Sequence, residues 1–97
     1  MRVILTRRAE RDFEAQVRWL QQHSPAAGRA AALRIVEVLD LLSHFPDTGM
    51  VVHGTTREKY VRFGRDGFVI RYRRSGDSLR VHRIFHSRQD RRASIAG

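Results

Sequence analysis

The class of fold is decided by the stretch Phe68-Val69-Ile70-Arg71-Tyr72-Arg73-Arg74. Phe68, Ile70 and Tyr72 alternate with residues that point the other way, which is the period of a β-strand that buries one of its faces. Turn signals bound this strand on both sides, with Gly64-Arg65-Asp66-Gly67 before it and Ser75-Gly76-Asp77 after it. We therefore predict an antiparallel strand over 68–74, with one apolar face and one face that carries arginines.

Further strands are predicted on both sides of this one. Tyr60–Phe63 precedes the first turn, Leu79–His86 follows the second turn and passes into a polar tail, and Val3–Leu5 opens the chain. A helix end at Phe45-Pro46-Asp47-Thr48-Gly49 is followed by a predicted loop to about Thr56.

Two helices are predicted between the first strand and that loop. The first begins after the N-cap Thr6 and ends by His23, because a residue before proline avoids the α region. The second begins at Ser24-Pro25 and continues to about His44. Only Arg34, Glu37 and Asp40 interrupt the apolar second half of this helix. We expect several neighbours to cover it: the sheet, the first helix and, in part, an oligomer or binding partner.

The predicted element order is β-α-α-β-β-β. It implies an α+β fold in which a helical hairpin packs on one face of a small, mainly antiparallel sheet, whose opposite face is basic. The chain has 97 residues, of which 41% are hydrophobic, so we expect a single domain over 1–97.

The composition excludes several classes of protein. The chain has no cysteine, so neither disulfides nor a thiolate zinc site can stabilise it. No apolar run approaches the roughly 18 residues that cross a membrane, and we expect a soluble protein of the cytoplasm.

Net charge is the strongest global signal. Nineteen Lys and Arg residues against ten Asp and Glu residues give a formal charge of +9, and Lys59 is the single lysine. The planar guanidinium pairs with phosphate or carboxylate in a bidentate manner, which favours a specific anionic partner. A GC-rich genome explains the arginine-to-lysine ratio equally well, but it does not explain the net charge.

Several motifs along the chain combine into a family resemblance. They are Thr6-Arg7-Arg8-Ala9-Glu10-Arg11-Asp12-Phe13, the helix break Ser24-Pro25, the helix exit Leu42-Ser43-His44-Phe45-Pro46-Asp47-Thr48-Gly49, Arg57 with Tyr60-Val61-Arg62-Phe63, the strand Gly67–Arg73, and the ending Val81–Asp90. In this order they resemble the RelE/ParE toxins of type II toxin–antitoxin systems. The resemblance implies a toxin that needs no cofactor and that a cognate antitoxin neutralises, in a toxin–antitoxin hetero-oligomer.

The family has two activities, and two positions favour one of them. RelE-like members cut mRNA on the ribosome with an arginine on the third strand and a tyrosine or histidine near the C-terminus, whereas ParE-like members inhibit DNA gyrase. Val69 stands where the resemblance places that arginine, and Ser87 rather than tyrosine follows His86. We therefore expect a non-enzymatic, ParE-like gyrase inhibitor. The alternative is a ribosome-dependent mRNA endoribonuclease.

The residues expected to contact the target or the antitoxin are Arg62, Arg71, Arg73, Arg83, His86 and Arg88. Metal-free RNA cleavage would need an acid, a base and cations for the developing phosphorane charge, and His86 would be catalytic only in that case. A structural histidine that closes the end of the sheet and hydrogen-bonds the tail is the other interpretation of His86. His82 lies on the same predicted strand and is expected to share its face, but no third ligand completes a metal site.

Like charges on one sheet face repel each other unless an anion or an acid offsets them, so the arginine face is expected to bind an acidic antitoxin tail or the target. The other interpretation is a solvated, partly salt-bridged face. A plain nucleic-acid-binding module is disfavoured because this face offers few aromatic residues for base stacking, and an inactive relative is the remaining option. Trp19 is expected to pack within the helical hairpin. If it is exposed, it becomes a candidate anchor for an antitoxin helix.

Overall fold

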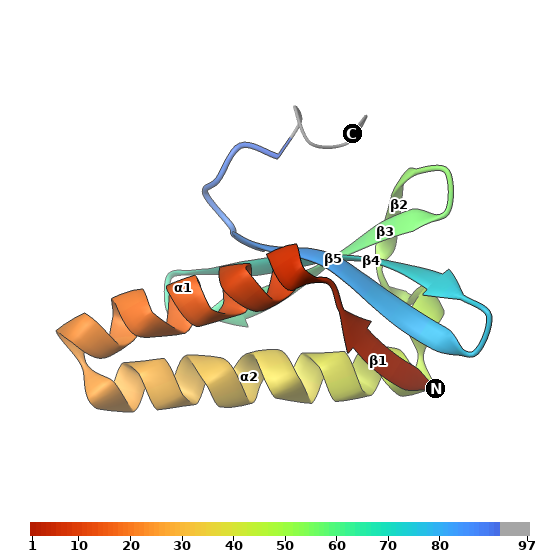
Figure 1. The fold of residues 1–97 in the computed structure, drawn as a ribbon. Coiled ribbons are helices and arrows are strands. Elements are labelled where there is room, and N and C mark those ends of the chain that lie inside the picture. The colour runs from red at the N-terminus through yellow and green to blue at the C-terminus, as the bar shows by residue number, and fades with distance from the viewer. Residues whose placement is uncertain (92–97) are drawn as a thin grey trace.

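A helical hairpin lies along one side of a five-stranded sheet in the computed structural model, which describes residues 1–91 (Figure 1). The elements are β1 (Arg2–Leu5), α1 (Arg7–His23), α2 (Pro25–His44), the 3-10 helix η1 (Pro46–Thr48), β2 (Met50–His53), β3 (Thr56–Phe63), β4 (Asp66–Ser75) and β5 (Ser78–His86). The predicted fold class is therefore confirmed, with one strand more than the predicted order.

The sheet order is β1-β5-β4-β3-β2, and all neighbours are antiparallel except β1 and β5. The additional strand, β2, lies in the segment that was predicted to be a loop. It has four residues and forms one edge of the sheet, with a register shift between Val51 and His53. The register shift within this short strand leaves no regular alternation for a sequence pattern to reveal. β3 begins at Thr56, four residues before the predicted start at Tyr60. The early start was missed because the charged residues Arg57, Glu58 and Lys59 show no apolar alternation.

Both predicted helix starts are confirmed. The Thr6 hydroxyl accepts a hydrogen bond from the Ala9 amide at 3.1 Å, and the Ser24 hydroxyl accepts one from the Ala27 amide at 3.2 Å. Each of these bonds satisfies an amide that the first helical turn leaves without a partner. The Thr6 hydroxyl also donates to the carbonyl of His82 on β5 at 3.0 Å, so the cap fastens α1 to the last strand.

The core fills the space between the hairpin and the sheet. Its fully buried side chains include Ile35, Leu42, Ile70, Tyr72, Leu79, Val81 and Ile84. The outer side of α2 is exposed in the single chain, since Leu33 is 64% exposed and Val36 is 53% exposed. The expectation that an oligomer or binding partner covers part of this helix stays a prediction. None of the helices within residues 1–91 is long and apolar enough to cross a membrane.

A β-bulge in β5 decides which side chains share a face. Arg71 pairs with Arg83 while the next residue, Tyr72, pairs with Val81, so His82 is the extra residue. As a result Val81 and Ile84 both enter the core although three positions separate them. The bulge reverses the alternation, so the expectation that His82 and His86 share a face was wrong.

Candidate functional site

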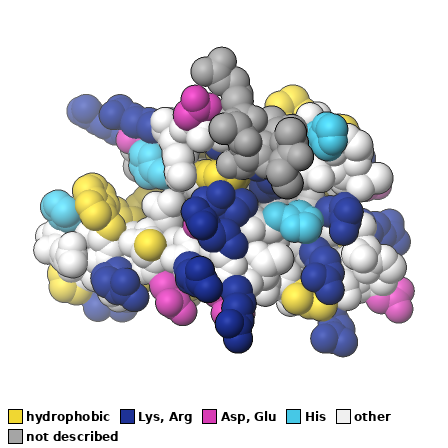
Figure 2. Space-filling model, turned by 45° about the horizontal axis from the view of Figure 1, so that its top comes forward, with side chains coloured by type: hydrophobic (Ala, Val, Ile, Leu, Met, Phe, Trp, Pro, Cys, Tyr) yellow, Lys and Arg dark blue, Asp and Glu magenta, His cyan; other side chains and the backbone are white. Residues whose placement is uncertain are grey.

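The candidate site is the sheet face turned away from α1 and α2, here called the open face (Figure 1). Alternation with the core residues assigns to it Glu58, Tyr60, Arg62, Val69, Arg71, Arg73, Arg80, His82, Arg83 and Phe85. Figure 2 brings this side toward the viewer and shows Lys and Arg side chains with histidines among them.

An ion pair lies at the centre of the open face, as the salt-bridged interpretation of this face allowed, although the sequence did not identify its acid. Glu58 on β3 stands directly across from Arg71 on β4, and its Oε2 accepts from Arg71 Nη2 at 2.7 Å and from Nε at 3.0 Å. The side chains of Arg71 and Glu58 are only 6% and 8% exposed. An acid that offsets Arg71 thus comes from within the chain, and it holds this arginine in a buried ion pair.

The C-terminal tail crosses the open face and joins this pair. Arg91 Nε donates to Glu58 Oε1 at 3.3 Å, and the Arg91 carbonyl accepts from Arg71 Nη2 at 3.3 Å. One carboxylate therefore fastens two arginines, one from β4 and one from the tail. Arg92 and the residues after it lie outside the described part of the chain.

Arg83 is also engaged. Its Nε and Nη2 donate to the carboxylate of Asp12 on α1 at 2.8 and 3.3 Å. The guanidinium carbons of Arg71 and Arg83 lie 4.7 and 4.5 Å from the ring centroid of buried Phe85. These cation–π contacts fix both guanidinium groups close to the sheet.

His82 is the titratable ring among the open-face arginines. Burial, followed by the positive charges of Arg73, Arg80 and Arg71, lowers the pKa of His82 from its ordinary value of 6.5. The ring is therefore neutral at pH 7 and can accept a proton or a hydrogen bond there. The sequence did not single out this role, because the bulge that turns His82 to this face has no clear sequence signal.

The pH dependence of folding tests this environment. Because the folded pKa of His82 is lowered, the unfolded chain binds a proton more readily, and His82 makes stability fall as the pH drops through 6.5. We expect the unfolding free energy of a His82→Gln variant to depend less steeply on pH between about 7 and 5. Urea titrations at several pH values measure this slope, and His53→Gln controls for the loss of an exposed histidine. An unchanged slope would contradict the assignment.

His86 lies apart from these arginines, at the end of the sheet on the helix side. Its Nδ1 accepts from the Arg88 amide at 3.2 Å, and its ring meets Phe68 edge-on at 6.4 Å. The ring also lines a hollow of about 390 Å³ with Trp19, Leu20 and Phe63. These contacts agree with the structural interpretation, in which the histidine closes the sheet and hydrogen-bonds the tail.

The structure thus divides the six predicted contact residues into three groups. Arg62 and Arg73 are exposed on the open face, Arg71 and Arg83 are held by Glu58 and Asp12, and His86 and Arg88 lie at the end of the sheet. Arg88 pairs with Asp66 at 3.0 Å. The sequence analysis did not identify Glu58 and Asp12 as the partners of these arginines. A predicted strand that began at Thr56 would have placed Glu58 across from Arg71.

Two further features complete the site. Trp19 is 60% exposed and stacks on His23 with ring centroids 4.4 Å apart, so the expectation that it packs within the hairpin was wrong. Within residues 1–91, no group of three His, Cys, Asp or Glu side chains could hold a metal ion.

Comparisons of the sequence and of the fold with known proteins identify similar toxins. The sequence model of the family described as "ParE toxin of type II toxin-antitoxin system, parDE" matches residues 3–91. Toxin RelE1 of Caulobacter vibrioides is 38% identical over 89 residues, which cover 92% of this chain and 96% of that protein. Toxin RelE3 of the same organism is 36% identical over 84 residues, which cover 87% of this chain and 91% of the relative. The solved structure "Chromosomal ParDE TA system from P. aeruginosa" superposes with a TM-score of 0.70 at 22% identity, over 89% of this chain and 95% of that one.

Proposed function

This chain belongs to the ParE/RelE family of toxins of type II toxin–antitoxin systems, and on that premise we propose that it inhibits DNA gyrase and is neutralised by a cognate antitoxin. The observation that carries the proposal is the separation of His86 from the open-face arginines. Catalysis of RNA cleavage needs an acid, a base and free cations within reach of one phosphate. Inhibition by binding needs only a surface of suitable shape and charge.

The positions and ion pairs of the open-face arginines also favour inhibition by binding over RNA cleavage. Val69 occupies the position where the resemblance places a nuclease arginine, and it is buried beside Phe85 on the neighbouring strand. The adjacent Arg71 is neutralised by Glu58. The exposed cations of the open face that remain, Arg62, Arg73 and Arg80, suit contact with an anionic surface.

A net charge of +9 fits an antitoxin that binds through an acidic segment. The complex would be sensitive to salt, because attraction between the basic toxin and the acidic segment speeds their encounter and salt screens it. The segment would lose conformational entropy when it becomes ordered on the toxin.

The direct test combines the purified chain with DNA gyrase and plasmid DNA. We expect supercoiling to be blocked or double-strand breaks to accumulate, and the antitoxin encoded beside the toxin to relieve the effect. Full gyrase activity at every toxin concentration would contradict the proposal.

Charge reversal on the open face sharpens this test. We expect the double variant Arg62→Glu with Arg73→Glu to raise the concentration needed for half-inhibition at least about tenfold, because both side chains are exposed and their charge would repel an anionic target. Arg29→Glu, at an exposed position of α2, is the control and should inhibit like the parent chain. Equal inhibition by all three proteins would place the gyrase contact elsewhere.

One observation supports the second candidate, a ribosome-dependent endoribonuclease. His82 is a neutral base on the open face beside Arg73 and Arg80. The name RelE, which the relatives described above carry, is in keeping with this candidate. In a purified translation mixture this activity would cleave mRNA, and either His82→Gln or His86→Gln would abolish the cleavage. Intact mRNA in the presence of the parent chain would exclude it.

A further inference from the structure

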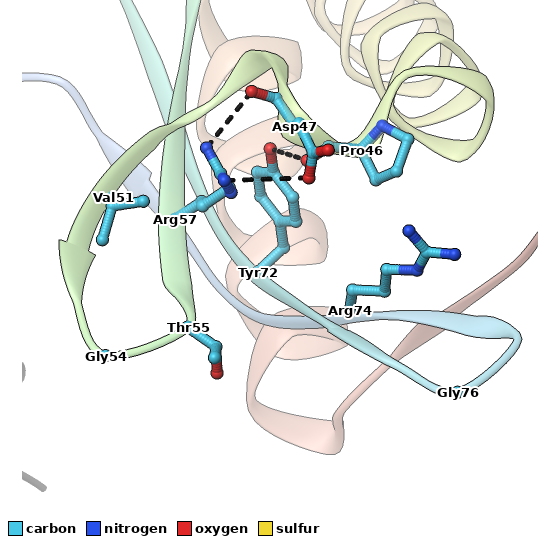
Figure 3. A pocket seen from close by; sticks show the side chains of 9 residues that line it. All are labelled: Pro46, Asp47, Val51, Gly54, Thr55, Arg57, Tyr72, Arg74 and Gly76. Atoms are coloured by element: carbon cyan, nitrogen blue, oxygen red, sulfur yellow. Dashed lines mark hydrogen bonds and ion pairs between the residues drawn. The ribbon is translucent and has the colours of Figure 1, made fainter.

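A second hollow lies on the helix side of the sheet, beyond the end of α2 (Figure 3). Its volume is about 520 Å³, and η1, the β2–β3 turn and the β4–β5 turn surround it. The side chains that give it chemical character are Pro46, Asp47, Val51, Arg57, Tyr72 and Arg74. We refer to it as the η1 pocket.

Tyr72 forms a rigid wall of the η1 pocket. Its side chain is fully buried, and its hydroxyl donates to the Pro46 carbonyl at 2.7 Å and accepts from the Gly49 amide at 2.9 Å. Burial, the largest influence, raises the pKa of this hydroxyl above 10.0, so it contributes no negative charge. The wall is therefore preformed and neutral.

Arg57 is fixed in place, and its ion pair with Asp47 is exposed and therefore weak. Its Nη1 donates to the carbonyl oxygens of Gly49 at 2.7 Å and of Asp47 at 3.2 Å. Carbonyl groups orient the guanidinium without neutralising it. The Asp47 carboxylate lies 3.7 Å from Nη2 and is 78% exposed, so solvent screens this pair.

Arg74 supplies a second positive charge. It extends from β4 toward η1 on the other side of the Tyr72 ring from Arg57 (Figure 3). It is exposed and makes no hydrogen bond or ion pair with any residue in the described range 1–91. Arg57 and Arg74 thus place two guanidinium groups around the neutral Tyr72 ring, and this positive lining favours an anion in the pocket.

We propose that the η1 pocket binds a carboxylate side chain from an acidic segment of a partner protein. A guanidinium pairs with a carboxylate through two parallel hydrogen bonds, and Val51 and Pro46 offer apolar contacts for the methylene groups of a glutamate. A nucleic-acid backbone fits less well, because it lacks the glutamate methylene groups that Val51 and Pro46 would contact, whereas the exposed Asp47 carboxylate at the rim repels either anion. The proposal is independent of whether the toxin acts on gyrase or on the ribosome.

The test uses the full chain and three probes in NMR titrations: the peptide acetyl-Glu-Glu-Glu-Glu-amide, inorganic phosphate and a short DNA duplex. We expect the peptide to shift the Nε–Hε signals of Arg57 and Arg74 and the amide signals of Gly54, Thr55 and Gly76, which line the pocket. Phosphate and DNA should move these signals less at equal charge concentration.

Variants of Arg74 decide whether the pocket is responsible. We expect Arg74→Gln to weaken peptide binding about tenfold and Arg74→Lys to weaken it less, because lysine keeps the charge but loses the bidentate geometry. Arg29→Gln removes the same charge from an exposed position on α2 and should bind like the parent chain. Arg74 has no partner in the described fold, so these variants test binding rather than folding. Equal losses for Arg74→Gln and Arg29→Gln, or stronger shifts with DNA than with the peptide, would overturn the proposal.

Discussion

Replacing Glu58 with alanine is expected to lower the unfolding free energy by about 3–5 kcal/mol, because it leaves the guanidinium of Arg71 buried without a counter-charge. Both hydrogen bonds that Arg71 donates to Glu58 disappear in this variant, as does the bond from Arg91 in the tail. The loss measures the cost of an unpaired buried charge and not the net contribution of the pair.

Chemical denaturation followed by circular dichroism measures this loss. The double variant Glu58→Leu with Arg71→Met removes both charges and keeps apolar volume, and we expect it to regain most of the lost stability. Glu37→Ala is the matched control, since the Glu37 side chain is 66% exposed and its pair with Arg34 lies on the surface. A loss below about 1 kcal/mol for Glu58→Ala would mean that water reaches Arg71 freely.

Replacing Asp12 with alanine is expected to cost about 3 kcal/mol of unfolding free energy, because this carboxylate accepts three hydrogen bonds in a partly buried position. Two come from Arg83, and the third comes from the Ile84 amide at 2.9 Å. The amide is a backbone group beside the bulge, and without Asp12 it has no replacement acceptor among the bonds described.

Asp12→Asn separates the two contributions. The asparagine oxygen still accepts the Ile84 amide while the charge is lost, so we expect an intermediate loss. Asp40→Ala, on the exposed side of α2, should change the unfolding free energy by less than about 0.5 kcal/mol. If all three variants unfold at the same denaturant concentration, Asp12 does not fasten α1 to β5.

Local chemistry explains why so much of the fold could be predicted from the sequence. Helix caps, the proline break and glycine turns act within a few residues, so Thr6, Ser24-Pro25 and the turn before Phe68 each specify a boundary by themselves. The missed strand β2 has no such signal, because pairing with β3 rather than its own sequence makes it extended.

The site was less predictable because it depends on pairing between strands. A shift of one position moves a side chain to the opposite face, and the bulge at His82 produces such a shift in β5. Residue type alone could not show that Arg71 is neutralised, since Glu58 is thirteen positions away along the chain. Arg62 and Arg73 were assigned correctly to an exposed face because no bulge precedes them in their strands.

The parallel pairing of β1 with β5 makes the two ends of the described chain depend on each other during synthesis. Arg2 aligns with Ser78 and Leu5 with Val81, so the first strand has no partner until β5 has been made. The cap from Thr6 to His82 and the clamp from Asp12 to Arg83 wait for the same segment. Contacts this distant in sequence form late and slow the folding of a small domain. A nascent chain that emerges from the ribosome without β5 therefore cannot complete the sheet, and its open face lacks the part that β5 contributes.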